Sequence, residues 1–163
     1  MYDIRNLNIW KENSQFRIGR YKDKILEADV SKGKEHIMND KCQQVFDEIL
    51  KLVPTANFAE IKKSRGGKLR YPIYINDRLM ETELEALELS VRSSNCLHRA
   101  GYRTIGELVD AIESSEDLKK IRNCGAKSID EIMGQLFCYQ YGLLPNERKV
   151  GYINKVLELN QGY

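Results

Sequence analysis

Residues 123–142 read NCGAKSIDEIMGQLFCYQYG and predict the longest helix of the chain. Beyond Gly125 the apolar residues recur at steps of three and four, which places them on one face of a helix. This expected buried stripe consists of Ile129, Ile132, Met133, Leu136 and Phe137. Gly142 stands where a left-handed C-cap belongs, and Pro145 follows at the distance usual for a helix stop. We therefore expect a helix from about residue 125 to about residue 141, with one buried face.

Shorter helices are predicted before it, from residue 82 onward. Thr104 and Glu107 have the capping-box spacing, in which each side chain binds a backbone N–H at the start of a helix. The apolar face of that helix consists of Ile105, Leu108, Val109 and Ile112. Ser114 or Ser115 can cap a third short helix, whose apolar residues are Leu118 and Ile121. Four helices within roughly 60 residues predict an all-α domain over residues 81–145. A helical tail is expected over residues 146–163, with an apolar face of Tyr152, Ile153, Val156, Leu157 and Leu159.

The first 80 residues predict a small α+β unit, so that the protein as a whole is α+β. Residues 39–53 form its clearest predicted helix, which Asn39 or Asp40 can cap and Pro54 ends. Three- and four-residue steps place six apolar side chains on one face of this helix: Cys42, Val45, Phe46, Ile49, Leu50 and Val53. The sequence gives no indication of what this unit does.

Two strands are predicted in the same unit. Residues 15–21 alternate weakly between polar and apolar side chains, and residues 69–75 alternate more strongly. Pro72 has no N–H to donate to a neighbouring strand, which indicates that the second strand lies at a sheet edge. Residues 64–68 read SRGGK and predict a turn before it.

Composition indicates a soluble globular protein of one or two small domains. The chain has 163 residues, of which 42% are hydrophobic and 31% charged. No apolar run approaches the length of about 18 residues that a membrane span needs. The N-terminus has no basic segment followed by an apolar one, so no secretory signal is expected. We therefore expect a cytoplasmic protein, without contact with a membrane.

The four cysteines are expected to be free and mostly buried. Cys42, Cys96, Cys124 and Cys138 include no Cys-x-x-Cys pair. Only two histidines, His36 and His98, are available to complete a zinc site, which would then need an unusual spacing. Unpaired cysteine behaves as a small apolar side chain in a reducing compartment. No metal and no cofactor are expected.

The charge is divided unevenly between the two halves of the chain. Residues 1–80 hold 16 Lys and Arg against 11 Asp and Glu, whereas residues 81–163 hold 10 against 13. The first half is therefore +5 and the second −3. A uniformly basic face, the usual footprint of non-specific nucleic-acid binding, is absent from the second half. Any DNA contact there must come from a few well-placed groups.

Two segments carry the chemistry that points to a function. Residues 91–97 read VRSSNCL, and some 25 residues later residues 123–132 read NCGAKSIDEI. Gly125 allows a close backbone approach or a positive φ. The free N–H groups that follow it would point outward at the positive end of the helix dipole, where they can bind an anion such as a DNA phosphate. Lys127 adds a charge and Ser128 a hydroxyl donor, although a plain helix cap with a solvated lysine is the alternative.

Both segments, in this order and at this distance, resemble the DNA-contacting segments of the C-terminal domain of the bacterial RNA polymerase α subunit. Residues 99–108, which read RAGYRTIGEL, also resemble that family, and the second segment is similar to one hairpin of the helix-hairpin-helix class. The similarity extends from about Glu83 to about Pro145 and leaves the first 80 residues unexplained. It implies an all-α domain of four to five helices that binds DNA.

The resemblance also implies roles for individual residues. Arg92 would enter the minor groove of A/T-rich DNA, where a planar, permanently charged guanidinium suits the deep negative potential. Asn95 lies three residues on, hence on the same helix face, and can bond a sugar, a phosphate or a base edge. Glu131 matches the family motif and would orient Arg92 or another cation, or bond DNA through water. The central expectation is that Arg92 lies beside the amides that open the long helix near residue 126, and that together they form one cationic site.

Two departures from the family pattern reduce the expected DNA affinity. Ala126 stands where relatives often carry a second lysine, and His98 where a lysine is usual. Each removes one charge, and the affinity of an isolated copy should be weak. In the polymerase, tethering offsets such weakness by raising the effective concentration. The 80 residues before this domain are too few for the α-subunit assembly domain, so other sources are expected: the basic segment 62–70, or self-association through the tail as a homo-oligomer.

Three functions can be weighed on the sequence. The preferred one is a stand-alone, transcription-associated protein that binds A/T-rich DNA through Arg92, Asn95, Gly125, Lys127, Ser128 and Glu131. The alternative is an interaction module that docks or mimics RNA polymerase α and binds sigma factor or activators, as the acidic second half suggests. An enzyme is not expected, because the sequence has no nucleophile elbow, zinc signature or nucleotide loop.

Overall fold

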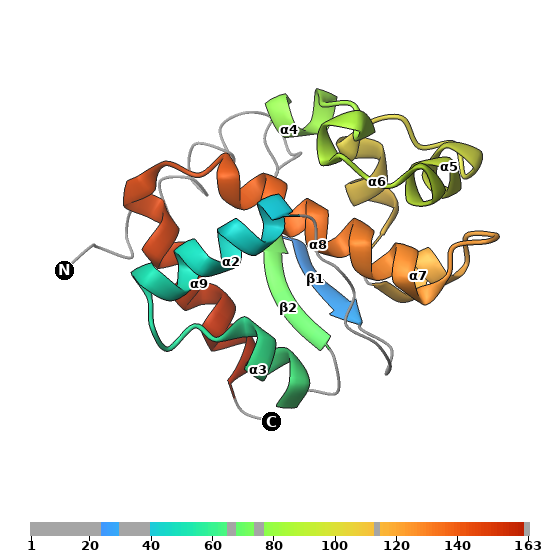
Figure 1. The fold of residues 1–163 in the computed structure, drawn as a ribbon. Helices are drawn as coiled ribbons and strands as arrows, with labels where there is room; N and C mark the ends of the chain where they lie inside the picture. The colour runs from blue at the N-terminus through green and yellow to red at the C-terminus, as the bar shows by residue number, and fades with distance from the viewer. Residues whose placement is uncertain (1–23, 30–39, 65–67, 74–76, 113–114, 162–163) are drawn as a thin grey trace.

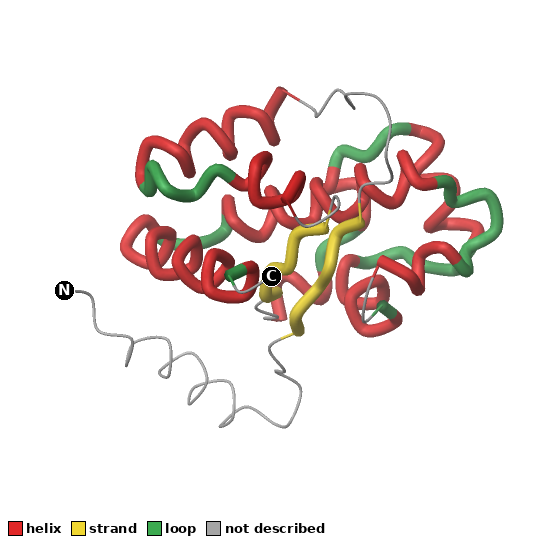
Figure 2. Tube along the Cα trace, turned by 90° about the horizontal axis from the view of Figure 1, so that it is seen from below, coloured by secondary structure: helices red, strands yellow, loops and turns green. Residues whose placement is uncertain are grey.

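The computed structural model describes residues 24–29, 40–64, 68–73, 77–112 and 115–161. These residues are mostly helical, with one two-stranded antiparallel sheet (Figure 1). In sequence order the elements are β1 (Lys24–Asp29), α2 (Asp40–Leu52), α3 (Phe58–Ser64), β2 (Lys68–Ile73), α4 (Asp77–Glu81), the 3-10 helix η1 (Leu84–Leu87), α5 (Val91–Arg99), α6 (Ile105–Ala111), α7 (Ser115–Lys119), α8 (Ala126–Gly142) and α9 (Asn146–Asn160). Figure 2 shows the two strands side by side in the middle of the molecule, with helices on either side of them.

Helix α8 is the element around which the others pack. It contacts both strands as well as α2, η1, α5 and α7. Its predicted stripe is confirmed: Ile129, Ile132, Met133, Leu136 and Phe137 are all buried. Because this helix touches elements from both halves of the protein, it fixes the first half of the molecule against the second.

The predicted left-handed C-cap at Gly142 is wrong. Gly142 is the last helical residue of α8, and the C-cap, Leu143, has right-handed helical angles of φ −81° and ψ −12°. The N–H groups of Leu143 and Leu144 bond to the carbonyls of Gln140 and Tyr141, so the backbone turns tightly into Pro145, the N-cap of α9. This turn satisfies the last carbonyls without a residue at positive φ, and the expected tail helix follows at once.

The sheet edge predicted from Pro72 is confirmed, and α9 covers it. Strands β1 and β2 pair with Ile25 opposite Pro72. On the far side of β2, the Pro72 carbonyl accepts from Gln140 at 2.8 Å and from the Tyr152 hydroxyl at 3.1 Å. The Asn160 amide donates to the Arg70 carbonyl at 2.7 Å and accepts from its N–H at 2.9 Å. The missing N–H of Pro72 therefore falls on an edge satisfied by side chains, where it removes no bond to β1.

One core joins the predicted N-terminal unit to the predicted all-α domain. The ring of Phe137 lies 5.1–6.4 Å, centroid to centroid, from five other aromatic rings, those of Phe46, Phe58, Tyr71, Tyr141 and Tyr152. These rings come from α2, α3, β2, α8 and α9. The boundary predicted near residue 80 is therefore a change in sequence pattern across which side-chain packing is continuous. The division of the chain into two domains near residue 80 stays a prediction.

The elements of the first half follow the predictions only in part. The helix expected over residues 39–53 is α2, and the strand expected over 69–75 is β2 over Lys68–Ile73. The predicted strand at 15–21 and most of the predicted turn at 64–68 lie outside the described residues. Strand β1 and helix α3 were not predicted, and both are short.

The capping box at the start of α6 is confirmed. The Thr104 hydroxyl accepts from the Glu107 N–H, while the Glu107 carboxylate accepts from the N–H groups of Arg103 and Thr104. These two backbone hydrogen bonds, that from Arg103 first, lower the pKa of Glu107 below its usual range. Because the pKa is lowered in the folded state, this stabilisation is present at neutral pH and is lost as the pH falls through the lowered value.

Substitution of Gly106 by alanine should destabilise the protein by about 1–3 kcal/mol. A Cβ at this position would lie 2.5 Å from the carbonyl oxygen and 2.9 Å from the Cα of Met80, because α6 packs directly on the backbone of α4. Gly151→Ala is the matched control: its Cβ meets no atom within 4 Å, and alanine favours a helix by up to about 1 kcal/mol over glycine. Urea unfolding measures both. Equal stability of the two variants would show that α4 and α6 do not approach this closely.

Candidate nucleic-acid interface

Helix α5 presents two of the predicted site residues to solvent. Its N-cap is Ser90, whose hydroxyl accepts from the Ser93 N–H. Ser93, Cys96 and Leu97 are buried, which leaves the face with Arg92 and Asn95 exposed. Among the described residues Arg92 has no salt bridge or hydrogen bond. Its guanidinium is therefore available to a ligand.

The first turn of α8 has no side-chain cap, and the turn before it contains a residue with positive φ. Asn123 takes a positive φ of 64°, a conformation that asparagine tolerates better than most residues. Gly125, predicted to approach closely or to take positive φ, has an ordinary φ of −76° and is the N-cap of α8. With no side chain, it places no capping oxygen on the first amides of the helix. Those N–H groups, with exposed Lys127 beside them, form the positive end of a 17-residue helix.

The structure brings Arg92 to this helix start, as the two sequence segments predicted. A Cβ built on Gly125 would lie 3.9 Å from one terminal nitrogen of the Arg92 guanidinium. Burial and the neighbouring Cys96 raise the pKa of Cys124 to about 11, and the Arg92 charge opposes that rise. The Cys96 thiol also donates to the Asn123 carbonyl at 3.1 Å, which ties α5 to the turn. We call the surface formed by Arg92, Asn95, Asn123, Gly125 and Lys127 the α5–α8 site.

Glu131 has a structural role that its sequence context did not indicate. Its carboxylate accepts from the Ser90 N–H at 2.5 Å, the Ser90 hydroxyl at 2.7 Å and the Ser93 hydroxyl at 2.5 Å. These bonds attach the first turn of α5 to the side of α8. Glu131 therefore positions the helix that carries Arg92, whereas the predicted roles were to orient Arg92 or another cation, or to bond a sugar or base through water.

Replacing Glu131 by alanine should lower the free energy of unfolding by about 2 kcal/mol. Three hydrogen bonds to a charged acceptor are lost, and the hydroxyl of fully buried Ser93 loses its acceptor. Glu158→Ala removes an equally charged side chain from an exposed ion pair of α9 and should change stability by no more than about 0.5 kcal/mol. Urea unfolding compares the two. A loss at Glu131 as small as that at Glu158 would contradict the positioning role.

Ser128 is the predicted site residue whose placement fits least well. Only 3% of its surface is exposed, so its hydroxyl is covered and does not stand in solvent beside Lys127. Asn123 is the site residue that was not predicted. The available signal was its type, because asparagine directly before a Cys-Gly pair is well suited to a left-handed turn.

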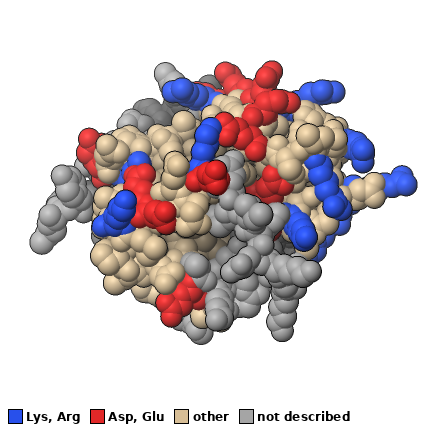
Figure 3. Space-filling model, viewed as in Figure 1, with Lys and Arg blue, Asp and Glu red and all other residues tan. Residues whose placement is uncertain are grey.

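The charged side chains of the second half are separated into an acidic part and a basic part, which the net value of −3 does not show. Residues 77–90 hold five Asp and Glu against one Arg, whereas residues 91–127 hold seven Lys and Arg against five Asp and Glu. Figure 3 shows carboxylates gathered over α4 and η1, and Lys and Arg along the edge formed by α5, α7 and the turn before α8. His98 bonds Glu85 of η1 at 3.1 Å, and so belongs to the acidic side. The α5–α8 site thus lies on the basic side of a polarised surface.

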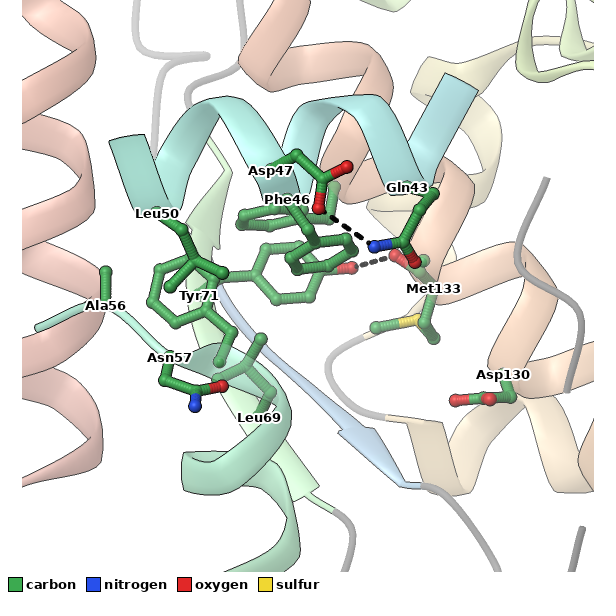
Figure 4. A pocket seen from close by; sticks show the side chains of 13 residues that line it. Gln43, Phe46, Asp47, Leu50, Ala56, Asn57, Leu69, Tyr71, Asp130 and Met133 are labelled. Atoms are coloured by element: carbon green, nitrogen blue, oxygen red, sulfur yellow. Dashed lines mark hydrogen bonds between the residues drawn. The ribbon is translucent and has the colours of Figure 1, made fainter. Parts of the chain in front are cut away.

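A separate pocket of about 210 Å³ lies between α2, α3, β2 and α8 (Figure 4). Its wall is largely apolar and includes four aromatic side chains, those of Phe46, Phe58, Tyr71 and Phe137. The charged residues of its lining are Asp47 and Asp130, and the lining contains no Lys or Arg. Two carboxylates repel phosphate, so this pocket is unsuited to nucleic acid.

Comparison with known proteins gives a match over the stretch that contains the α5–α8 site. Residues 75–137 match the family model that describes the C-terminal domain of the alpha subunit of bacterial RNA polymerase. These residues are similar to that domain. The matched stretch, here named the α C-terminal-like region, begins just before α4 and ends within α8, slightly earlier at both ends than the predicted span of about 83–145. It contains every predicted site residue.

Curated relatives of the α C-terminal-like region are subunits of a bacterial enzyme. The DNA-directed RNA polymerase subunit alpha of Moorella thermoacetica is 52% identical over 60 residues, which make up 37% of this protein and 18% of the relative. The corresponding subunit of Desulforamulus reducens is 47% identical over 85 residues, 52% of this protein and 24% of the relative. That of Borreliella afzelii is 37% identical over 87 residues, 53% and 25%. The match thus spans about a fifth to a quarter of these relatives' length, and no solved structure matches.

The described residues offer neither a membrane span nor a metal site. No helix among them is long and apolar enough to cross a membrane. Within the same part of the protein, no group of three or more His, Cys, Asp and Glu side chains is placed to hold a metal ion. All four cysteines are free and buried, as predicted.

Proposed function

We propose that this protein is a stand-alone, transcription-associated protein that binds the minor groove of A/T-rich DNA through the α5–α8 site. The observation that carries the proposal is the approach of the Arg92 guanidinium to within 3.9 Å of the Cβ position of Gly125, at an uncapped helix start. One fully charged side chain and one set of fixed backbone donors then face the same volume. The similarity of residues 75–137 to the polymerase domain supports DNA as the ligand.

Each group of the site has a distinct role in this proposal. Arg92 enters the minor groove, whose negative potential is deepest where A/T-rich sequence narrows it. The first amides of α8 and the Lys127 ammonium hold a neighbouring phosphate. Asn95 and Asn123 offer amide groups to sugar or base edges, and Glu131 holds α5 in place through Ser90 and Ser93. In this proposal the site binds DNA without making or breaking a covalent bond, so the protein is not an enzyme. Because its ligand is DNA, it acts at the nucleoid.

Fluorescence anisotropy with labelled A/T-rich and G/C-rich duplexes at two salt concentrations tests the proposal. The A/T-rich duplex should bind more tightly, and both affinities should fall as salt rises because phosphate contacts release counterions. Equal affinity for the two duplexes would remove the minor-groove preference. Absence of binding to both at low salt would remove the proposed function.

The acidic surface supports a second candidate function. Figure 3 shows carboxylates gathered over α4 and η1, and five acidic residues lie on or beside these elements in the sequence: Asp77, Glu81, Glu83, Glu85 and Glu88. A surface of this charge suits a basic patch on a protein such as a sigma factor or an activator. In this function the protein docks onto or mimics RNA polymerase α, and DNA contact is secondary. Capture from bacterial lysate that recovers neither a polymerase component nor a transcription factor would count against it.

A further inference from the structure

A second basic surface adjoins the α5–α8 site. A hollow of about 630 Å³ lies between the end of α5, the end of α6 and α7. The polar and charged side chains in its lining are Arg99, Tyr102, Asp117, Lys120, Arg122 and Asn123. Three cations thus face one carboxylate, which makes the hollow unlike the acidic surface of α4 and η1.

The charges of the hollow are only partly compensated. Asp117 bonds the Lys120 ammonium at 2.7 Å and so offsets one of the three cations. Arg99 and Arg122 are exposed, and among the described residues neither has a salt bridge. The hollow also includes the C-terminal end of α5, whose carbonyls repel anions. An anion bound there must therefore be held by the guanidinium groups. Each guanidinium can donate two parallel hydrogen bonds to the oxygens of one phosphate.

The hollow and the α5–α8 site share one residue. Asn123 lines the hollow, and the turn that it begins leads within two residues to Gly125 beside Arg92. The Cys96–Asn123 bond holds this turn against α5, so the two surfaces keep a fixed relation. A duplex seated on the α5–α8 site would therefore bring further phosphates of its backbone toward Arg99 and Arg122.

We infer that the hollow is a second phosphate subsite for the same DNA duplex, an inference that rests on the proposed function. It supplies the cations that the α5–α8 site lacks. Ala126 has no charged group, and the His98 ring bonds Glu85 of η1, so neither residue supplies the charge of a lysine to this site. Arg99 and Arg122 restore two charges on the adjoining surface. The subsite reads no sequence, because it contacts only the backbone.

The test compares two double variants of the full-length protein. Arg99→Ala/Arg122→Ala removes the two guanidinium groups of the hollow, and Arg78→Ala/Lys155→Ala removes two exposed cations from α4 and α9. Each changes the net charge equally. Affinities for A/T-rich and G/C-rich duplexes are measured by anisotropy across a series of salt concentrations, and thermal unfolding checks the fold.

The subsite predicts that the Arg99→Ala/Arg122→Ala variant loses roughly 1.8 from the slope of log affinity against log salt, about 0.9 for each phosphate contact. Both duplexes should weaken by the same factor, which leaves the A/T preference intact. A slope and affinity equal to those of the control pair would overturn the subsite. If the wild type still prefers A/T-rich DNA in that case, the proposed function stands. A wild type that binds neither duplex overturns both.

Discussion

Replacing Arg92 by alanine is expected to weaken binding to an A/T-rich duplex by roughly 5- to 150-fold, which corresponds to about 1–3 kcal/mol. Arg92 provides a side chain that combines a permanent charge with a place directly over the start of α8. The loss should be smaller for a G/C-rich duplex, because its wider minor groove attracts an inserted cation less. The ratio of the two affinities should therefore fall toward one.

The control for Arg92→Ala is Arg78→Ala. Arg78 is an exposed arginine in α4, within the acidic surface. Its removal changes the net charge by the same amount and should leave the A/T preference unchanged. Both positions are exposed, so neither variant should unfold, and urea unfolding verifies this. Unchanged DNA binding by Arg92→Ala, in a folded protein, would remove Arg92 from the interface and the minor-groove proposal with it.

Replacing Phe137 by alanine is expected to lower the free energy of unfolding by about 3–5 kcal/mol, the cost typical of truncating a buried phenylalanine. Phe137 is 2% exposed, and five other aromatic rings from α2, α3, β2, α8 and α9 surround it. Domains of this size are commonly stable by only about 5–15 kcal/mol. The variant should thus lose a large share of its stability. Because the core is shared, both halves of the protein should be destabilised together.

Urea unfolding followed by circular dichroism measures this effect and tests the shared core. Leu50→Ala is the control, since Leu50 on α2 is 38% exposed and should cost much less. Because the core is continuous, we expect one transition in the wild type and in both variants. Two separated transitions, with Phe137→Ala shifting only one, would instead support the division at residue 80.

Local patterns in the sequence were sufficient to predict the longer helices and their buried faces. The α8 stripe, the α2 helix and the Thr104 capping box depend on residues within a few positions of one another, and all three are present. The left-handed C-cap predicted at Gly142 was wrong. The N–H groups of Leu143 and Leu144 bond the last carbonyls of α8, so the backbone needs no left-handed residue there. Strand β1 was missed because its six residues are recognisable only through their pairing with β2, some 45 positions later.

The sequence predicted those parts of the candidate site that lie within the two recognised segments. It did not predict the contacts that form only when the helices pack together. The approach of Arg92 to Gly125 followed from the resemblance of the two segments to one family. The bonds from Glu131 to Ser90 and Ser93 could not be predicted, since they join residues about 40 positions apart across two helices. The net charge of −3 over residues 81–163 was also a poor guide to the surface. A sum of charges cannot show that folding separates the acidic surface of α4 and η1 from the basic edge.

The most direct measurement of DNA binding at the α5–α8 site is a titration of the isotope-labelled full-length protein with an A/T-rich duplex, followed by the backbone amide signals in NMR spectra. We predict that the largest shifts occur at Arg92, Asn95, Asn123, Gly125 and Lys127. Amides of α4 and η1, on the acidic surface, should change little. Shifts concentrated on α4 and η1 or around the aromatic pocket, with the amides of Arg92 and Gly125 unmoved, would contradict DNA binding at this site.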